Sequence, residues 1–493
     1  MSASLTITLT MAVPLIGAVL VGLTGRWPNL REAVTVVTAV VLFFLVVSLL
    51  TPLQEGVSQQ AFWFTVVPGI DLAFDVEPLG MLFGLIASFL WIPTSFYAFG
   101  YMRAHKEENQ TRFYACFAIA IGCAMGIAFA SNLFTLFIFY ELLTLSTFPL
   151  VTHSGTDEAR RAGRTYLGIL LGTSIALQLL AIIWTWTLSG TLDFAPGGIL
   201  RNHASDATIG VLLALYVFGI GKAAVMPFHR WLPAAMVAPT PVSALLHAVA
   251  VVKAGVFTVL KVTIYVFGVD VLHDLGSSRL MMYAAAITLV LASLIALRQD
   301  NLKRRLAYST VSQLSYIVLG AMLATSAGIT GGAMHIATHA FGKITLFFCA
   351  GAIIVAAHKT EVSQLDGIGR TMPFTMAAFL IGSLSIIGLP PMAGLWSKWY
   401  LLLGTYQAGD YVLLGALLVG SLLSAGYLLP VVVRAFFRQP AGIAVGGAGA
   451  ARAGINEAPM ACVIPLLVTA AGCIVLFLWP QPLYQLVRTL GGG

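Results

Sequence analysis

The sequence predicts an all-α polytopic membrane protein of fourteen transmembrane helices, two of them discontinuous. The first observation is composition: 59% of the 493 residues are hydrophobic and 9% are charged, with a mean hydropathy of +0.93. No soluble core needs so much apolar surface. The second is length, because about 20 apolar residues per span and short connections fit fourteen helices into the chain. The third is the occurrence of lysines inside apolar runs, where an ionisable group is usually functional.

The expected elements follow from apolar runs separated by polar connections. The first run lacks a basic leader and a small-residue cleavage site, so we expect a helix there and not a signal peptide. Gln59 to Val76 is half-polar with aromatics and a Pro-Gly turn, which predicts an extracytoplasmic hairpin. The Gly/Ala-rich segment Ala441 to Gly454 predicts a flexible cytoplasmic loop. The expected spans are approximately 5–24, 32–52, 78–102, 112–130, 132–152, 163–187, 208–227, 240–267, 280–297, 302–324, 327–357, 373–404, 410–437 and 459–480.

Charges at the connections predict the orientation of the spans. Basic residues gather at alternate connections, for example Arg160-Arg161 and Lys303-Arg304-Arg305, and acidic residues at the intervening ones. The positive-inside rule then places both termini outside the cytoplasm. The net charge of +7 therefore reflects topology, and we expect no nucleic-acid partner.

Two expected spans are interrupted, at Gly219–Pro233 (GIGKAAVMPFHRWLP) and at Gly388–Leu402 (GLPPMAGLWSKWYLL). Proline removes a helix hydrogen bond and clashes with the preceding turn. In a bilayer such a break survives only where protein or water satisfies the freed backbone groups. A lysine lies within eight residues of each break (Lys222, Lys398). Paired interruptions favour an inverted repeat with its site near the midplane.

Glu141 is the only acid in the middle of an expected span, and Lys222 is the base beside the first break. Burial disfavours a charged ammonium, and a nearby carboxylate favours it. A Glu–Lys pair whose separation changes can therefore load and unload a proton. Every expected mid-membrane base is a lysine, and arginine does not lose its proton in proteins. For Glu141 the structural alternative is a packing acid that is hydrogen-bonded to a neighbouring helix.

Three further lysines lie in the later spans. After Lys253, the pair Ala254-Gly255 would permit a local unwinding that lets water reach the amine. Lys261 lies near the end of the same span, and we expect it to extend to the membrane interface. Lys398 follows the second break. We expect it to be the group through which protons leave or enter; the alternative is a lysine that extends to the membrane interface.

His335, His339 and Lys343 occur at i, i+4 and i+8 in GGAMHIATHAFGKITLFF. At 100° per residue they drift about 80° around the helix and form one stripe roughly 12 Å long. Histidine titrates near neutral pH and can relay protons. Zinc binding through the two histidines fits their spacing, but no third ligand lies nearby in the sequence, so we expect no metal.

No sequence motif indicates an enzyme or a cofactor. The chain has no Walker A sequence, no dinucleotide fingerprint and no Ser-His-Asp candidate outside the membrane. Its five cysteines fall in apolar spans without a CxxC pair, which is typical of packing. We therefore expect no cofactor, and an energy source in an ion gradient or a partner subunit.

The chain resembles, in four long stretches, the antiporter-like subunits shared by Mrp-type cation/proton antiporters, respiratory complex I and membrane-bound hydrogenases. These stretches are FYELLTLSTFPL, GKAAVMPFHRWLPAAMVAPTPVSALLHAVAVVKAGVF, DNLKRRLAYSTVSQLSY and HIATHAFGKITLFFCAG. The resemblance covers essentially the whole chain and implies two five-helix inverted repeats. The implied organisation is three N-terminal helices with the hairpin (1–110), the first repeat (111–268), the second repeat (269–438), and a cytoplasmic loop with the last helix (439–493).

The resemblance also implies a role for each buried charge. Glu141 and Lys222 match the Glu–Lys pair of the first half-channel, and Lys253 matches the central lysine. His335, His339 and Lys343 match the connecting histidine–lysine stretch. Lys398 matches the terminal residue of the second half-channel.

The chain length and the sequences HAFGK and LDGIGRTMP are most similar to the Mrp branch. The implied function is a proton-translocating subunit of a multisubunit Na⁺/H⁺ antiporter in a bacterial inner membrane. Its partners would be other membrane subunits, protons and sodium. A proton-pumping subunit of complex I or a membrane-bound hydrogenase is one alternative. A non-conducting subunit that anchors partners is another.

Overall fold

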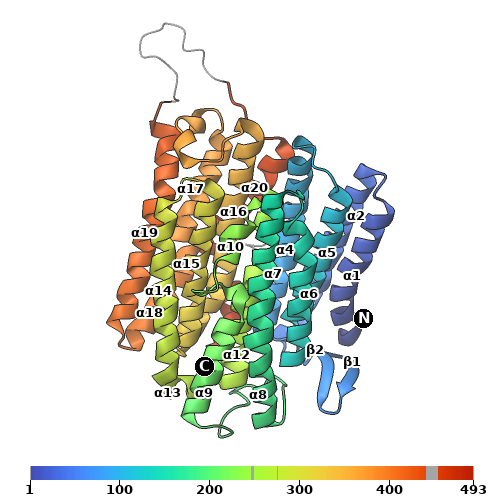
Figure 1. Cartoon of the computed structure of the whole chain (residues 1–493), viewed down its shortest axis with the longest axis vertical. Coiled ribbons are helices and arrows are strands. Elements are labelled where there is room, and N and C mark those ends of the chain that lie inside the picture. Colours follow the sequence, from blue (N-terminus) through green and yellow to red (C-terminus); the bar gives the residue numbers. More distant parts are fainter. Residues whose placement is uncertain (1, 246–248, 275, 440–453, 492–493) are drawn as a thin grey trace.

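The computed structural model describes residues 2–245, 249–274, 276–439 and 454–491 of the chain. Most of them lie in long helices that run side by side along the long axis of the molecule (Figure 1). A β-hairpin projects at one end, which we call the hairpin end. The other end, where residues 358–372 lie, is called the opposite end.

The N-terminal part of the chain combines four long helices with the hairpin. Its elements are α1 (Ala3–Leu23), α2 (Pro28–Ser48), α3 (Leu50–Gln54), β1 (Gln60–Val67), β2 (Ile70–Asp75), α4 (Pro78–Ala104) and α5 (Gln110–Ala128). The middle part contains α6 (Leu133–Val151), α7 (Asp157–Thr173), α8 (Leu180–Ser189), α9 (Asp206–Gly219), α10 (Trp231–Ala234), α11 (Thr240–Ala244), α12 (Val251–Val262) and α13 (Val269–Asp274). The C-terminal part contains α14 (Gly276–Arg298), α15 (Leu302–Met322), α16 (Ser326–Ala357), α17 (Pro373–Ile387), α18 (Gly394–Gln407), α19 (Tyr411–Phe437), α20 (Met460–Leu478) and α21 (Gln481–Val487).

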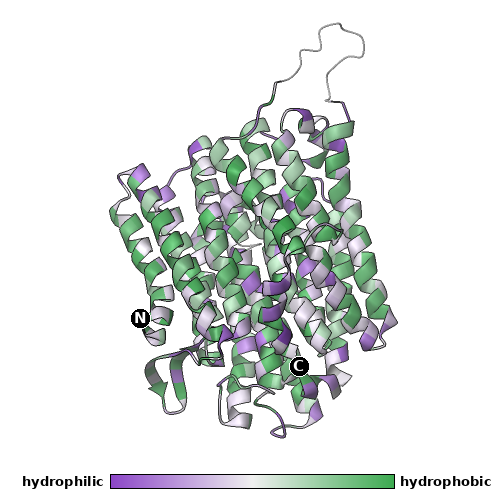
Figure 2. Cartoon of the chain, turned by 180° about the vertical axis from the view of Figure 1, so that it is seen from behind, coloured by the Kyte–Doolittle hydropathy of each residue, from purple (hydrophilic) through white to green (hydrophobic). Residues whose placement is uncertain are grey.

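Within the described residues, ten helices are long and apolar enough to cross a membrane. Hydrophilic residues collect at the two ends of the molecule and at a few positions between them (Figure 2). This pattern is that of a multi-pass, helical membrane protein. Two shorter apolar helices, α9 and α17, are the ones that end at the expected interruptions. The total of fourteen spans stays a prediction.

Helix boundaries follow local capping chemistry. The Asn132 side chain accepts a hydrogen bond from Thr135 N (2.7 Å) at the start of α6, and Thr156 accepts one from Ala159 N (3.2 Å) at the start of α7. Such caps satisfy orphan N–H groups of the first turn. Proline stands in the first turn of α2, α4 and α17, where its missing N–H is harmless.

The predicted hairpin is confirmed. Strands β1 and β2 pair antiparallel from Gln60 opposite Asp75 to Val67 opposite Ile70. Gly69, with φ +85°, makes the turn that a side chain would strain. Asp75 N donates to Phe129 O (2.7 Å), so the hairpin is fixed to the end of α5.

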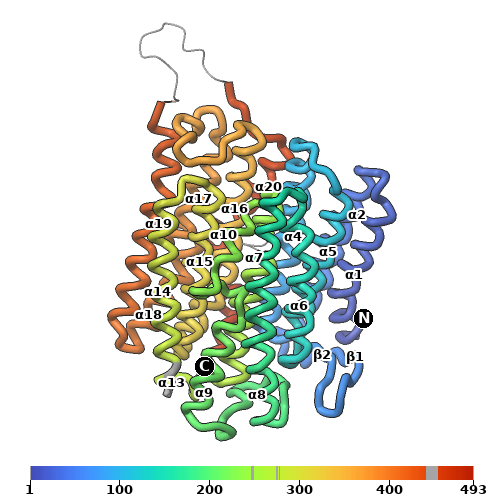
Figure 3. The backbone as a smooth tube through the Cα atoms, in the orientation of Figure 1, coloured from blue at the N-terminus to red at the C-terminus, as the bar shows by residue number. Residues whose placement is uncertain are grey.

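Both predicted interruptions are confirmed, and Figure 3 lets the reader follow the backbone through them. α9 ends at Gly219, a 3-10 turn covers Gly221–Ala223, and α10 begins at Trp231. The second break lies between α17 and α18 and begins at Gly388, whose φ is +89°. Each break contains one cis X-Pro peptide bond, Met226–Pro227 or Pro390–Pro391.

The span expected at 240–267 differs from the prediction. α11 ends at Ala244 and α12 begins at Val251, and residues 246–248 between them lie outside the described residues. The unwinding expected after Lys253, at Ala254-Gly255, is wrong because α12 runs through both residues. Gly255 serves close packing instead: a Cβ there would lie 2.3 Å from the carbonyl carbon of Lys222. The loop expected at Ala441 to Gly454 lies, except for Gly454, outside the described residues.

α16 occupies the centre of the C-terminal half. It packs against α4, α11, α12, α15, α17, α18, α20 and α21. Nearly all its residues from Gly328 to Ile353 are buried. Tyr97 of α4 donates to the Phe348 carbonyl (3.0 Å), and the two rings stack at 4.0 Å. α16 therefore joins the N-terminal helices to the second half of the chain.

Candidate functional site

Lys222 is fully buried in the 3-10 turn of the first interruption. Its ammonium donates to the Tyr140 carbonyl (2.7 Å) and to Thr144 Oγ1 (2.6 Å), both on α6. The Tyr140 ring also faces the ammonium, at 3.1 Å from its centroid. The break thus places the amine against α6, because the chain there can leave the helical path.

Glu141 lies on α6, next to Tyr140 in the sequence, and is half-buried. Both carboxylate oxygens are shielded from solvent and have no hydrogen-bond partner within the described part of the chain. The predicted Glu141–Lys222 pair therefore does not form a direct hydrogen bond in this structure. An unpartnered buried carboxylate is costly, which marks Glu141 as a group that a packing role does not explain.

Lys253 and His339 are in direct contact. Lys253 Nζ lies 2.6 Å from His339 Nδ1, which joins α12 to α16. The His339 ring is stacked on that of His335 with centroids 5.8 Å apart. All three side chains are at most 1% exposed. The structure therefore brings the central lysine and both histidines of the predicted stripe together.

His335 contacts two polar side chains that the sequence did not single out. Its Nε2 lies 3.2 Å from Gln313 Oε1 on α15, and its Nδ1 lies 2.9 Å from Ser397 Oγ on α18. An amide oxygen can only accept, so Nε2 is assigned the proton and Nδ1 stays an acceptor. Ser397 precedes Lys398 in the sequence, which brings the stripe next to the second interruption.

Lys343 is the last member of the stripe and is fully buried. Its ammonium donates to Ser309 Oγ (2.6 Å) and to the Leu306 carbonyl (3.2 Å), both on α15. Ser309 and Gln313 are thus two residues that sequence reasoning missed. Their signal was present: they stand at i and i+4 on one face of α15, in a stretch that also contains Thr310, Ser312 and Ser315.

Lys398 lies early in α18 and is 5% exposed. Its ammonium donates to the Ile387 carbonyl (3.1 Å), freed by the break, and to Ser421 Oγ (3.0 Å) on α19. The Tyr316 ring faces it at 4.5 Å. The amine is therefore hydrogen-bonded inside the protein, which disfavours the interfacial alternative.

The expectation for Lys261 is wrong. Its side chain is 1% exposed, and its ammonium lies 3.2 Å from Glu77 Oε1. It also donates to the Ala130 carbonyl (2.8 Å), and Tyr265 OH donates to Glu77 Oε2 (2.6 Å). Its ion-pair partner at the start of α4 is more than 180 residues away in sequence, so a local pattern could not predict that the amine turns inward.

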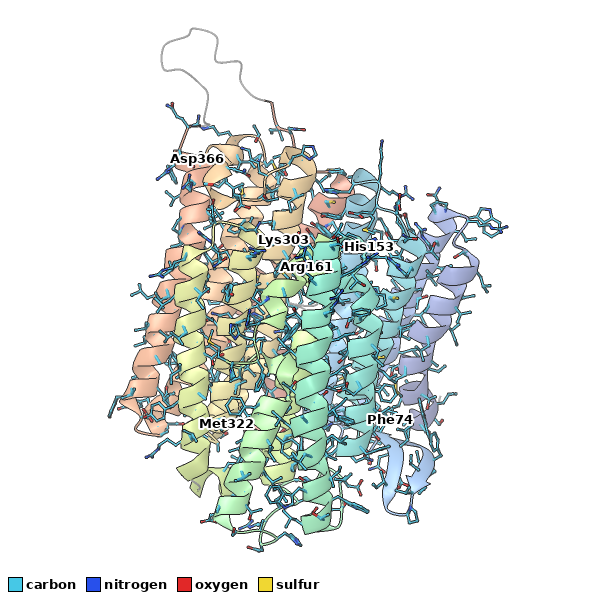
Figure 4. The ribbon with its side chains drawn as sticks, in the orientation of Figure 1. Phe74, His153, Arg161, Lys303, Met322 and Asp366 are labelled. Atoms are coloured by element: carbon cyan, nitrogen blue, oxygen red, sulfur yellow. The ribbon has the colours of Figure 1, made fainter. Side chains whose placement is uncertain are left out.

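A polar cavity of about 620 Å³ opens at the opposite end, beside the first interruption. Pro233 and Val237 line it together with Asp300 and Lys303. Lys303 Nζ donates to the Ala238 carbonyl (2.6 Å). Hydrogen bonds from Ser363 hold the pKa of Asp300 below its ordinary value. Figure 4 shows Arg161, Lys303 and Asp366 in the half of the molecule that includes the opposite end, and Met322 and Phe74 in the half that includes the hairpin end.

Together the contacts form one buried polar path, and Lys222 and Glu141 lie apart from it. The path begins with Lys253, which contacts His339, and His339 is stacked on His335. From His335, Gln313 extends the path toward Lys343, and Ser397 extends it toward Lys398. Lys222 and Glu141 lie on the other side of α12, whose Gly255 packs on the Lys222 backbone. Each buried lysine at bilayer depth costs about 2.5–3.5 kcal/mol, which hydrogen bonding in the site must offset.

Residues 130–424 of the chain match the protein family described as "NADH:quinone oxidoreductase/Mrp antiporter, TM". Subunit N of NADH-quinone oxidoreductase from Desulforudis audaxviator is 33% identical over 429 residues, covering 84% of this chain and 83% of the relative. Subunit L of the Escherichia coli enzyme is 30% identical, covering 87% and 71%. The chain spans about half of a longer relative, NAD(P)H-quinone oxidoreductase chain 5 of Synechocystis sp., at 32% identity.

Two solved structures share the fold. A chain of the Mrp complex from Dietzia sp. DQ12-45-1b matches with a TM-score of 0.88 and 22% identity, covering 100% of this chain and 97% of the other. A chain of the membrane-bound sulfane sulfur reductase, an archaeal respiratory membrane complex, matches with a TM-score of 0.83 and 24% identity, covering 99% and 97%. At these identities the likeness concerns the fold alone.

Proposed function

Because this chain belongs to the NADH:quinone oxidoreductase/Mrp antiporter family, we propose that it is a subunit of a multisubunit Na⁺/H⁺ antiporter of the Mrp type. It is an antiporter-like, proton-translocating membrane subunit. The observation that carries the proposal is the buried contact path from Lys253 through His339 and His335. Lys222, Lys253, Lys343 and Lys398 are buried and belong to no catalytic motif, which suits ion movement and not bond chemistry.

In the proposed mechanism the proton passes along groups that can both bind and release it. A protonated Lys253 can hand its proton to His339 Nδ1 across 2.6 Å. The centroids of the two histidine rings are 5.8 Å apart, so the proposed transfer between the rings uses an intervening water molecule. Gln313 orients His335 so that Nδ1 faces the Ser397 hydroxyl, beside Lys398. Protons thereby reach Lys343 and Lys398 from the centre of the molecule.

Glu141 and Lys222 are proposed as the loading pair of the first half. In this structure Lys222 is held by Tyr140 and Thr144, while Glu141 has no partner among the described residues. A movement of the flexible lysine chain toward Glu141 would stabilise its charged form, and a return to Thr144 would favour release. The interruption at Lys222 supports this role because it lets the amine move without bending a whole helix.

The orientation is part of the proposal. The opposite end, with its polar cavity and its basic residues, is assigned to the cytoplasm of a bacterial cell, and the hairpin end to the outside. The inverted repeats at 111–268 and 269–438 are likewise proposed. One interrupted helix with a lysine in each range supports them.

Protons are the proposed cargo of this chain, and sodium is assigned to a partner subunit. A hard cation needs several oxygen ligands. Glu141 is the only carboxylate in the middle of an expected span, and one carboxylate is a thin ligand set.

A redox-driven complex is the second candidate. It is favoured by the likeness to subunits N and L of NADH-quinone oxidoreductase, at 33% and 30% identity. Copurification separates the candidates: partners with quinone-reducing or hydrogenase cofactors would reject the antiporter assignment. Partners that are membrane subunits without redox centres support it.

Replacing Glu141 by alanine tests the function itself. We expect Glu141→Ala to reduce Na⁺-driven proton movement in everted membrane vesicles at least about tenfold, with normal assembly of the complex. A subunit that only anchors partners would assemble and transport at the parent rate. That result would also reject the proposed role of this residue.

A further inference from the structure

Lys343 has two hydrogen-bond partners of different kinds. The Leu306 carbonyl can only accept a hydrogen bond, whereas the Ser309 hydroxyl can accept or donate one. A lysine that keeps its proton needs acceptors alone. A buried lysine that gives its proton up also needs a partner that can donate to the neutral amine.

Ser309 is the first of three linked hydroxyls between α15 and α19, which we call the hydroxyl run. Ser309 Oγ lies 2.8 Å from Tyr427 OH, and Tyr427 OH lies 2.9 Å from Ser424 Oγ. Ser424 Oγ lies 2.8 Å from the Gly420 carbonyl within α19. All three hydroxyl-bearing side chains are 0% exposed, so solvent cannot replace these partners.

The hydroxyl run can satisfy both charge states of Lys343. When the amine is protonated it donates to Ser309, Ser309 donates to Tyr427, Tyr427 to Ser424, and Ser424 to the Gly420 carbonyl. When the amine is neutral, the bonds between the hydroxyls reverse, and Ser309 donates to Nζ. A carbonyl or carboxylate in place of Ser309 would satisfy the protonated state only.

The far end of the run meets the group that orients His335. Gln313 Nε2 donates to Ser424 Oγ (3.4 Å), and its Oε1 accepts from His335 Nε2 (3.2 Å). Ser424 has an acceptor site for Gln313 in either direction of the run. The His335 orientation is therefore kept while Lys343 changes charge.

We propose that Tyr427, together with Ser309 and Ser424, is a positioning group of the proton-transfer site, whose hydrogen bonds reverse each time Lys343 loses and regains its proton. This inference rests on the proposed function, because it matters only if Lys343 titrates during transport. The reversal rotates three hydroxyl protons and transfers none of them. The proton that leaves Lys343 passes to water or to the histidine stripe.

The charged surroundings of Lys343 show why such a partner is needed. The α17 and α20 segments that pack on α16 contain no charged residue in their sequence. Among the described residues, the charged groups and histidines near the site on α12, α15, α16 and α18 include no carboxylate. They are Lys253, Arg305, His335, His339 and Lys398. Hydrogen bonds that the charged amine donates to neutral acceptors must therefore stabilise it.

Two variants test the inference in the whole complex in everted vesicles, by the pH at which transport is half-maximal. Tyr427→Phe leaves the Ser309 hydroxyl without its acceptor when Lys343 is charged. The charged amine is therefore destabilised relative to the neutral amine. We expect the half-maximal pH to fall by about half to one unit. Ser309→Ala removes the direct acceptor of the charged amine, and we expect a fall of about one to two units.

Tyr216→Phe is the matched control. Tyr216 is equally buried, and its hydroxyl lies 2.8 Å from Thr185 Oγ1 between α8 and α9, away from the stripe. A structural role alone would lower assembly or thermal stability in all three variants and leave the half-maximal pH unchanged. A shift in the two run variants, absent in Tyr216→Phe, supports the inference.

The outcomes separate this inference from the proposed function. If Glu141→Ala abolishes transport and both run variants keep the parent half-maximal pH, the hydroxyl run is overturned and the function stands. Should Tyr427→Phe fail to assemble, Ser309→Ala alone decides in the same way. If Glu141→Ala keeps full transport, the proposed function falls and the inference falls with it.

Discussion

Each of the four lysines proposed for proton transfer owes its place to partners that are specific to it. Lys222 is held by α6, Lys253 by a histidine of α16, Lys343 by hydroxyls of α15 and Lys398 by a carbonyl that a broken helix sets free. None of the four forms an ion pair among the described residues. Neutral partners leave a lysine free to lose its proton, whereas a fixed carboxylate, as at Lys261, holds the charge in place.

Lys343→Arg separates charge from titration. The guanidinium keeps the positive charge but does not lose its proton in proteins, so we expect transport to fall at least about tenfold while the complex still assembles. Proton movement in everted vesicles and the amount of assembled complex are the two measurements. Lys106→Arg, at a lysine outside the membrane spans, is the control and should transport normally. Normal transport by Lys343→Arg would show that this amine acts as a fixed charge.

At the scale of elements, the interruptions do more than break helices. Each one places a lysine and frees backbone carbonyls, and the freed Ile387 carbonyl is used at once by Lys398. Glycine then allows the neighbouring helix to touch the broken segment: α12 packs on the Lys222 backbone through Gly255. Proline and glycine in the sequence predicted where the helices break. The close contact between helices depends on which helix lies opposite the break, and no local sequence pattern predicts that.

Gly255→Ala tests this contact. The new methyl would lie 2.3 Å from the Lys222 carbonyl carbon and 2.4 Å from Ala223 N, so α12 or the broken segment must shift. We expect a loss of about 1–3 kcal/mol in stability and slower proton transport, because Lys222 moves with its backbone. Thermal unfolding of the purified complex and vesicle transport measure the two effects.

Gly415→Ala on α19 is the matched control for that experiment. Nothing lies within 4 Å of the position that the new methyl would take, so no neighbour has to move. In a helix interior, alanine is favoured over glycine by roughly 0.5–1 kcal/mol. Equal behaviour of the two variants would show that the α12 contact does not position Lys222.

At the scale of the whole molecule, the proposed orientation has a direct test. Val67 is exposed in the hairpin, and Arg161 is exposed at the opposite end. We expect a membrane-impermeant thiol reagent to label Val67→Cys in intact spheroplasts. Arg161→Cys should be labelled only after permeabilisation, with the parent chain as background for its five cysteines. The reverse labelling pattern would show that the molecule has the opposite orientation in the membrane.

Much of the fold was predictable because membrane spans are written locally in the sequence. Apolar runs predicted most helices, the Pro-Gly turn predicted the hairpin, and the two Gly/Pro segments predicted both interruptions. Contacts between distant elements were not predictable in this way. Tyr427 stands 118 positions from Ser309 and Glu77 stands 184 from Lys261, so neither the hydroxyl run nor the inward turn of Lys261 has a local signal.

The predicted site fared similarly. The i, i+4, i+8 spacing placed His335, His339 and Lys343 on one buried stripe of α16. The direct contact of Lys253 with His339 required the relative placement of α12 and α16. Sequence reasoning paired Glu141 with Lys222 by their chemistry, but the Lys222 amine donates instead to the Tyr140 carbonyl and to Thr144 on the same helix.

The burial of α16 on every side has a consequence for how such chains can be recombined. Segments of relatives could be exchanged most safely where few contacts cross the junction, and α16 faces eight other α-helices of the described residues at once. A junction inside residues 326–357 would pair half of this helix with foreign neighbours on both sides. We expect working chimaeras to keep α16 together with the stretches of α12, α15 and α18 that contact it, whichever parent supplies them.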